Sequence, residues 1–479
     1  MKSPRRLGWL LLTLPVAALA ADADPSRYFL IKAGDEVIGH IVQRTEPIPD
    51  GQRETSEQVI TVEAAGIVTR TRTRSETIDD AAGRPRRFSE RTLTGSTART
   101  VEAAIGSKLI DFTVTTAADR QTRRLAIDPS TRFDGGAGLL AQWVKAPAER
   151  LRFDNVDLDD MTVDVVTIEK IGDGPRPGTI EAIRVRGNGD EDIYGLAKLT
   201  IGSDGTIESI VQPMFGMNAV IVPTDRATAL KDRAAFKVLD RSMVKAPFRI
   251  QKEALAGHIR YRFAFRDRLS VPVPVTGEQR VRREDDGSVR IDVCARCGPG
   301  LSTDPGYLDK ARAATPWMES DHPRIRAFAA PIGKLAVSDA RKMEMLRAKA
   351  LPVIGTVDFA GHFSALQTMQ RRRGDCTESA VLLAALGRAI GIPTKVANGL
   401  VYSRSYYHGV SNVFMPHSWT LAFVDGRWQS FDLALDAFDS SHIALTVGDG
   451  EPRSIQAASQ IAGLLDWKSV EEVRQRPAG

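Results

Sequence analysis

One segment is the strongest indication of the fold in the C-terminal part of this chain: Arg371-Arg372-Arg373-Gly374-Asp375-Cys376-Thr377-Glu378-Ser379-Ala380. Asp375 and Glu378 have the spacing of a capping box, and the apolar run that follows to Ile390 predicts a helix that begins at Cys376. Apolar side chains occupy nearly every side of this helix. We therefore expect it to be buried, with its N-terminus facing a cleft.

The position of Cys376 favours a reactive thiol. At the first helical position, the positive end of the helix dipole stabilises a thiolate and lowers the pKa of the thiol. A free cysteine is also one of the most buried residue types, so this position alone does not separate a nucleophile from a small core residue. A catalytic role requires a base close to the sulfur.

A base and a carboxylate partner are predicted in a hairpin further along the chain. Residues 418–432 read as two strands joined by the turn Asp425-Gly426. In the register that this turn sets, Asp432 lies opposite Trp419, and His417 is the diagonal neighbour of the carboxylate on the same face. Such a carboxylate orients the imidazole and stabilises the imidazolium. The sequence therefore predicts a nucleophile, a base and an orienting residue.

Together these motifs resemble the transglutaminase-like superfamily. The matching segments are Gly374-Asp375-Cys376, Gly391-Ile392-Pro393, Pro416-His417-Ser418-Trp419 and Asp425-Gly426-Arg427-Trp428, followed by Asp432. The resemblance covers residues 301–450 and implies a papain-like domain in which a central helix packs on an antiparallel sheet. It also implies that Cys376 is the nucleophile, His417 the general base and acid, and Asp432 the orienting residue.

The oxyanion site is less completely predicted. The backbone N–H of Cys376 can supply one donor, and we expect Gln367 to supply the second. The resemblance implies that an aromatic residue upstream of the cysteine often assists, but no Trp occurs between Trp317 and Cys376.

The resemblance implies acyl transfer from a peptide or side-chain amide through a thioester. With water as acceptor the protein would be a protease or amidase, and with a lysine amine it would be a cross-linking transglutaminase. We favour hydrolysis, because the resemblance implies that many bacterial members with a small domain of this kind are peptidases. The remaining interpretation is a catalytically inactive module that binds a cell-envelope partner. No cofactor is expected.

The other cysteines form a C-x-x-C motif at Cys294 and Cys297. This motif is compatible with a redox pair or half a zinc site, but no second Cys or His pair stands at ligand spacing. A local structural disulfide is the favoured interpretation in an exported protein.

Three histidines of the same region, His362, His408 and His442, have no predicted carboxylate partner and are interpreted as surface or loop residues. The aspartates Asp432, Asp436 and Asp439 do not have the spacing of an EF-hand, so no metal site is predicted. The run Arg371–Arg373 is interpreted as a solvated cluster, or as a group that attracts an acidic substrate.

The N-terminus predicts export. Residues 1–20 contain a basic segment, an apolar run over Leu7–Leu19 and the cleavage pattern Ala18-Leu19-Ala20, which are typical of a signal peptide. The apolar run is shorter than the roughly 20 residues of a spanning helix. We expect a periplasmic or secreted protein without a transmembrane segment after cleavage.

Composition excludes several classes of protein. The 479 residues are 42% hydrophobic and 26% charged, which excludes a disordered chain, and three cysteines exclude a disulfide scaffold. Loss of Lys2, Arg5 and Arg6 with the signal peptide lowers the formal net charge from +5 to +2. This charge is too small to indicate nucleic-acid binding. The resemblance to the transglutaminase-like superfamily implies a peptide or protein substrate as the partner.

The predicted class is α+β, with one or two antiparallel β-rich domains before the papain-like domain. Residues 21–222 alternate apolar and polar side chains between turn signals, including the hairpin turn at Asp204-Gly205, and are predicted to form a β-rich domain. This domain is interpreted either as a platform for a cell-envelope partner or as a scaffold. Residues 223–300 are predicted as a connecting helix around Ala227–Leu239 and a small β region. Residues 451–479 are predicted as a helical tail.

Overall fold

The computed structural model describes residues 26–473, except for gaps at 65–66, 95–96, 117–119, 129–130, 132, 134–136, 159–160, 188–193, 215–216, 238–243, 247, 266–270, 357–361, 404–411 and 436. The predicted signal peptide, His408 and Asp436 therefore lie outside the described residues. The chain divides into two compact units at residues 238–239. Each unit is described by itself.

The N-terminal unit is built on one 15-stranded sheet. Its elements are β1 (Ser26–Ala33), β2 (Glu36–Ile48), β3 (Gly51–Ala64), β4 (Ile67–Asp80), β5 (Pro85–Thr94), β6 (Thr97–Ile105), β7 (Leu109–Thr116), β8 (Arg120–Ala126), α1 (Ala137–Lys145), β9 (Arg150–Asp157), β10 (Thr162–Asp173), β11 (Thr179–Gly187), β12 (Tyr194–Gly202), β13 (Ile207–Met214), β14 (Met217–Thr224), α2 (Arg226–Ala229) and β15 (Phe236–Lys237).

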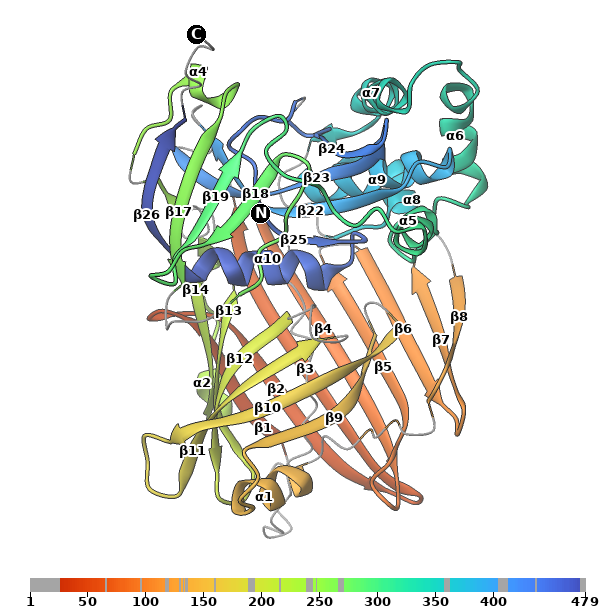
Figure 1. Cartoon of the computed structure of the whole chain (residues 1–479). Helices are drawn as coiled ribbons and strands as arrows, with labels where there is room; N and C mark the ends of the chain where they lie inside the picture. The colour runs from red at the N-terminus through yellow and green to blue at the C-terminus, as the bar shows by residue number, and fades with distance from the viewer. Residues whose placement is uncertain are drawn as a thin grey trace. The chain divides into compact units, whose positions relative to one another are not determined.

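Strands β1 to β8 form one antiparallel meander and β9 to β14 form another (Figure 1). The pairing of β1 with β14 joins the two meanders, and β15 adds to β3 in parallel. Apolar side chains alternate with polar ones along the strands, so one face of the sheet is buried. In β1, for example, Phe29, Ile31 and Ala33 are buried. The predicted β-rich N-terminal region is confirmed, including the hairpin of β12 and β13.

The C-terminal unit contains two larger sheets and most of the helices. Its elements are β16 (Val244–Lys245), α4 (Lys252–Leu255), β17 (Ile259–Phe265), β18 (Gln279–Arg283), β19 (Val289–Val293), α5 (Pro305–Arg312), α6 (Pro323–Gly333), α7 (Asp339–Ala350), η2 (Leu351–Val353), β20 (Gly355–Thr356), α8 (Ala365–Arg371), β21 (Arg373–Gly374), α9 (Cys376–Ala389), β22 (Thr394–Ser403), β23 (Val413–Val424), β24 (Arg427–Phe431), β25 (Ile443–Gly448), α10 (Pro452–Leu464) and β26 (Leu465–Glu472).

Helix α9 is buried along nearly its whole length and packs against β23, α6 and α8 (Figure 1). The larger sheet has the order β16-β23-β22-β25, with β24 paired to β23. Leu382, Leu383 and Leu386 of α9 belong to one buried cluster with Val396 of β22 and Ala422 of β23. The central helix on an antiparallel sheet is thus confirmed, and with it the α+β class.

Two expectations are corrected, and the first concerns the second sheet of this unit, β18-β19-β17-β26. The predicted helical tail contains α10, but residues 465–472 form strand β26, which pairs with β17 because Trp467 packs on the aromatic rings of that strand. The predicted helix around Ala227–Leu239 is reduced to the four residues of α2, and Phe236–Lys237 form β15.

Among the described residues, no helix has both the length and the apolar character needed to cross a membrane.

Candidate active site

The N-terminus of α9 has the predicted capping box. The Asp375 side chain accepts a hydrogen bond from the Thr377 N–H at 2.7 Å, and Glu378 accepts one from the Asp375 N–H at 2.9 Å. Glu378 is fully buried, and burial first and the Asp375 charge second raise the pKa of its carboxyl. This cap fixes Cys376, a half-buried free cysteine, at the start of the helix.

The hairpin of β23 and β24 also has the predicted register. Val424 pairs with Arg427 across a turn in which Asp425 and Gly426 have φ angles of 50° and 79°. His417 lies in β23, and Asp432 follows directly after β24. The Nε2 atom of His417 is 2.6 Å from Oδ2 of Asp432. The two residues are 3% and 1% exposed, so this hydrogen bond is shielded from water.

His417 also forms a hydrogen bond with Cys376, so the imidazole is linked to both the thiol and the carboxylate. Because Nε2 faces Asp432, Nδ1 is the nitrogen available to the sulfur. Burial alone lowers the pKa of His417, but the charge and hydrogen bond of Asp432, with those of Cys376, outweigh it and raise the pKa to about 10. The site therefore favours an imidazolium, the natural counterion of a thiolate.

Asp432 accepts more hydrogen bonds than sequence reasoning indicated. Its Oδ1 atom accepts from the N–H groups of Ala434 and Leu435 at 2.8 and 3.0 Å. Its Oδ2 atom faces His417 and, at 3.0 Å, Nε2 of His442. Burial alone raises the pKa of Asp432, but the charge and hydrogen bond of His417, with those of His442, hold it well below its usual range.

His442 lies in a loop, as one of the two predicted alternatives had it, but it is neither at the surface nor without a carboxylate partner. His442 is 1% exposed and contacts Asp432 through Nε2 and Asp439 through Nδ1. The contact with Asp439 could have been predicted from the sequence, because this carboxylate lies three residues before the histidine. The contact with Asp432 could not, because it depends on how the loop after β24 folds back toward Asp432.

The buried group of His417, Asp432 and His442 has residue types that can bind a metal. Ligands of a tetrahedral zinc ion lie about 3.3 Å from one another, as bond lengths of about 2.0 Å require. The Oδ2 atom of Asp432 is 2.6 Å from one imidazole nitrogen and 3.0 Å from the other. These are hydrogen-bond distances, so the arrangement favours a hydrogen-bonded network over a metal centre.

Gln367 has a different task in the structure from the one predicted. Its side-chain oxygen accepts a hydrogen bond from the Ser364 N–H at 3.1 Å and completes the capping box of α8. The oxyanion role of Gln367 stays a prediction. His362 is half-buried, with its ring 4.4 Å from that of Trp317.

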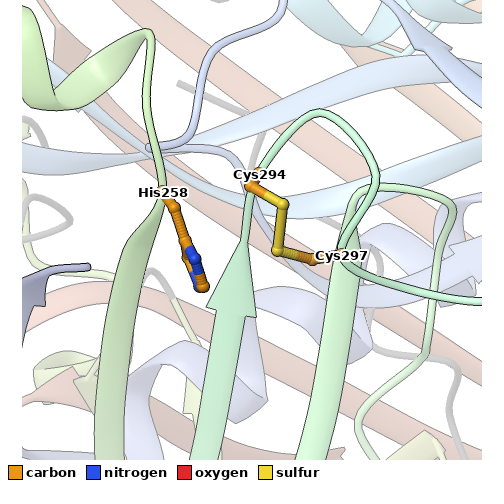
Figure 2. Close-up of side chains that lie close together, drawn as sticks. All are labelled: His258, Cys294 and Cys297. Carbon is orange, nitrogen blue, oxygen red and sulfur yellow. A yellow bond between two sulfur atoms is a disulfide. The ribbon is translucent and has the colours of Figure 1, made fainter. Parts of the chain in front are cut away.

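Cys294 and Cys297 form a disulfide with His258 beside it (Figure 2). Both sulfur atoms are used in that bond, so the thiolates that a zinc site needs are not available. His258 has a separate partner, since its Nε2 atom is 2.9 Å from Oδ1 of Asp292.

The segment before β18 supports the strands that carry the site, a role that the sequence did not reveal. Both oxygens of buried Glu278 accept hydrogen bonds from Ser430, from its N–H and its hydroxyl, each at 2.9 Å. The Gln279 side chain donates a hydrogen bond to the Ala444 carbonyl at 2.8 Å and accepts one from the Ala444 N–H at 2.9 Å. The second sheet therefore holds both β24 and β25.

The chain was compared with protein families, curated proteins and solved structures. Residues 337–433 match the family model of the transglutaminase-like superfamily. No curated protein matches the chain. Two solved structures are similar to parts of it. A putative cysteine protease from Cytophaga hutchinsonii is 16% identical, with a TM-score of 0.28 over 46% of this chain and 84% of that one. A putative protease from Parabacteroides distasonis is 13% identical, with a TM-score of 0.20 over 73% of this chain and 69% of that one.

Proposed function

Residues 337–433 are transglutaminase-like, and from this premise we propose that the chain is an exported, cysteine-dependent acyl-transfer enzyme that hydrolyses peptide or side-chain amides. The observation that carries the proposal is the double link of His417, which forms hydrogen bonds with both Cys376 and Asp432. Export rests on the signal-peptide pattern of residues 1–20.

The first half of the proposed reaction forms a thioester. The Cys376 thiolate attacks the carbonyl carbon of the amide, and a carbon–sulfur bond forms. The His417 imidazolium then donates its proton to the amide nitrogen, and the carbon–nitrogen bond breaks to release an amine. Asp432 remains ionised throughout and holds the ring in the orientation that serves both steps.

The second half of the reaction depends on the acceptor. A water molecule attacks the thioester, neutral His417 takes up its proton, and the carbon–sulfur bond breaks to restore the thiolate and release a carboxylic acid. A primary amine would attack the same carbon and give a new amide instead. We infer that water is the acceptor, and the family resemblance to bacterial peptidases is the support for this choice.

A competition experiment tests the acceptor. The protein is incubated with a peptide mixture in the presence of a labelled alkyl primary amine, and the products are identified by mass spectrometry. We expect peptides or side-chain amides that have gained one water, with no labelled conjugate. A labelled conjugate as the main product would contradict hydrolysis and indicate a transglutaminase. An inactive binding module would give neither product, and Cys376→Ala provides the blank.

A further inference from the structure

One oxygen of Asp432 faces two imidazole rings. His417 lies 2.6 Å from Oδ2 on one side, and His442 lies 3.0 Å from the same atom on the other. The other carboxylate oxygen is held by two backbone N–H groups. A carboxylate has about four lone-pair sites, so Asp432 has no remaining freedom to turn.

His442 is itself fixed on its other side. Its Nδ1 atom lies 3.1 Å from Oδ1 of Asp439 and 3.2 Å from the Asp439 backbone nitrogen. In the imidazolium Nδ1–H donates to Oδ1, and in the neutral tautomer with a proton on Nε2 the Nδ1 atom accepts from the Asp439 N–H. The ring contacts Trp419 edge-on and Phe438 in a tilted arrangement, with centroid distances of 5.1 and 4.7 Å. A buried ring with polar contacts on both nitrogens and aromatic neighbours has a single orientation.

The turn from Asp439 to His442 is anchored to the second sheet. Tyr261 of β17 donates a hydrogen bond to the Ser440 carbonyl at 2.9 Å. The Ser440 N–H and hydroxyl donate to the carbonyls of Leu255 and Gly257 at 2.8 and 2.6 Å. None of these residues lies within 337–433, so the support comes from outside the segment that matches the family.

Gly399 allows His442 to reach the site. It pairs with His417 in β23 and lies at the bulge where β22 meets the start of β25. A Cβ atom at this position would be 1.8 Å from the Ile443 carbonyl oxygen. Only glycine permits this close approach of the two strands, which brings His442 beside His417.

We propose that His442, held by Asp439, is a positioning residue that aims the Asp432 carboxylate at His417. The inference rests on the proposed function, since it concerns the same Cys376 site. The Nε2–H group of His442 donates to Asp432 and keeps Oδ2 in reach of the His417 ring. In this role His442 acts on the imidazole through Asp432.

The charges around His442 are consistent with this role. The ionisable groups that face it are Asp432, Asp439 and His417. Burial lowers the pKa of His442, but the hydrogen bonds to Asp432 and Asp439 outweigh burial and the repulsion of His417, so the pKa is raised. Neutral or protonated, the ring can keep a proton on Nε2 and donate it to Asp432.

The test compares His442→Gln with His442→Asn in the full-length protein. A glutamine amide reaches the place of Nε2 and can donate to Asp432. An asparagine amide takes the place of Nδ1, keeps the Asp439 contact and falls short of Asp432. The readout is the alkylation rate of Cys376 between pH 5 and 9, which needs no substrate. Thermal unfolding midpoints are measured for each variant.

At pH 6 we expect His442→Asn to alkylate on the order of tenfold more slowly than wild type, the lower end of the range for outer-shell partners of catalytic groups. His442→Gln is expected within about twofold of wild type, because it retains the donor. His258→Asn, the same substitution at the half-buried His258–Asp292 pair, should leave the profile unchanged.

Wild-type alkylation profiles for both variants would overturn the proposal. An equal loss of alkylation rate in both variants, or unfolding of both, would also overturn it and assign His442 a role in packing alone. An unreactive thiol in the wild-type protein is a different result. That outcome would remove the proposed enzymatic function itself, so the two failures are distinguishable.

Discussion

Cys376→Ser is expected to abolish turnover of the acyl donor, with a fall in kcat on the order of 10⁵-fold or more, as for loss of the nucleophile in other triads. The hydroxyl of serine is far less acidic than a thiol, and the raised pKa of His417 makes its imidazole a poor base at neutral pH because it is already protonated. The measurement is single-turnover kinetics with the donor identified in the peptide screen.

Folding should be almost unchanged in this variant. Cys376 is half-buried and forms no disulfide, so replacement of one sulfur by oxygen disturbs little packing. The thermal midpoint should therefore stay within about 2 °C of wild type, which corresponds to less than about 1 kcal/mol. Turnover at the wild-type rate would remove Cys376 from the mechanism.

Asp432→Asn is expected to lower kcat by about 10³- to 10⁴-fold, the loss seen when a triad aspartate becomes an amide. The structure gives a specific reason. Both oxygens of Asp432 face N–H donors, from Ala434 and Leu435 on one side and from two imidazoles on the other. An amide replaces one acceptor by an NH₂ group, so in either orientation it points a donor at donors.

The matched control for this variant is Asp292→Asn. Asp292 is also a buried partner of a histidine, His258, but it lies in β19 of the second sheet. We expect Asp292→Asn to retain kcat and Asp432→Asn to lose it, when both are compared at equal folded fractions. Equal kcat values for Asp432→Asn and wild type would show that the imidazole does not need the carboxylate.

The part of the site that the sequence predicted is encoded by local signals. A capping box places Cys376 at a helix N-terminus, and a two-residue turn sets the register that brings His417 to Asp432. His442 escaped prediction because its approach to Asp432 depends on the pairing of β22 with β25 and on the anchoring of Ser440 by Tyr261. Those contacts join residues far apart in the chain.

The same distinction applies to the fold. The alternation of the N-terminal strands predicted antiparallel sheet, but the pairing of β1 with β14 joins the first and last meander strands, and no local pattern encodes it. Strand β26 begins at Leu465, directly after α10 ends at Leu464. Without a turn residue between them, the helical pattern extended over the strand.

The most direct test of the central claim is the alkylation rate of Cys376 as a function of pH, in wild type and in His417→Ala. Mass spectrometry first establishes that Cys294 and Cys297 are bridged, so that one site is labelled. Because the pKa of His417 is about 10, the ring remains an imidazolium through neutral pH and loses its proton only above that value. The wild-type thiolate should therefore persist well below the ordinary thiol pKa of about 8.5.

At pH 6 an unassisted thiol is about 0.3% thiolate, so we expect wild type to alkylate about 100-fold faster than His417→Ala. The His417→Ala profile should return to that of an ordinary thiol. Slow alkylation with an ordinary profile in both proteins would contradict an activated Cys376–His417 pair, and with it the proposed enzyme.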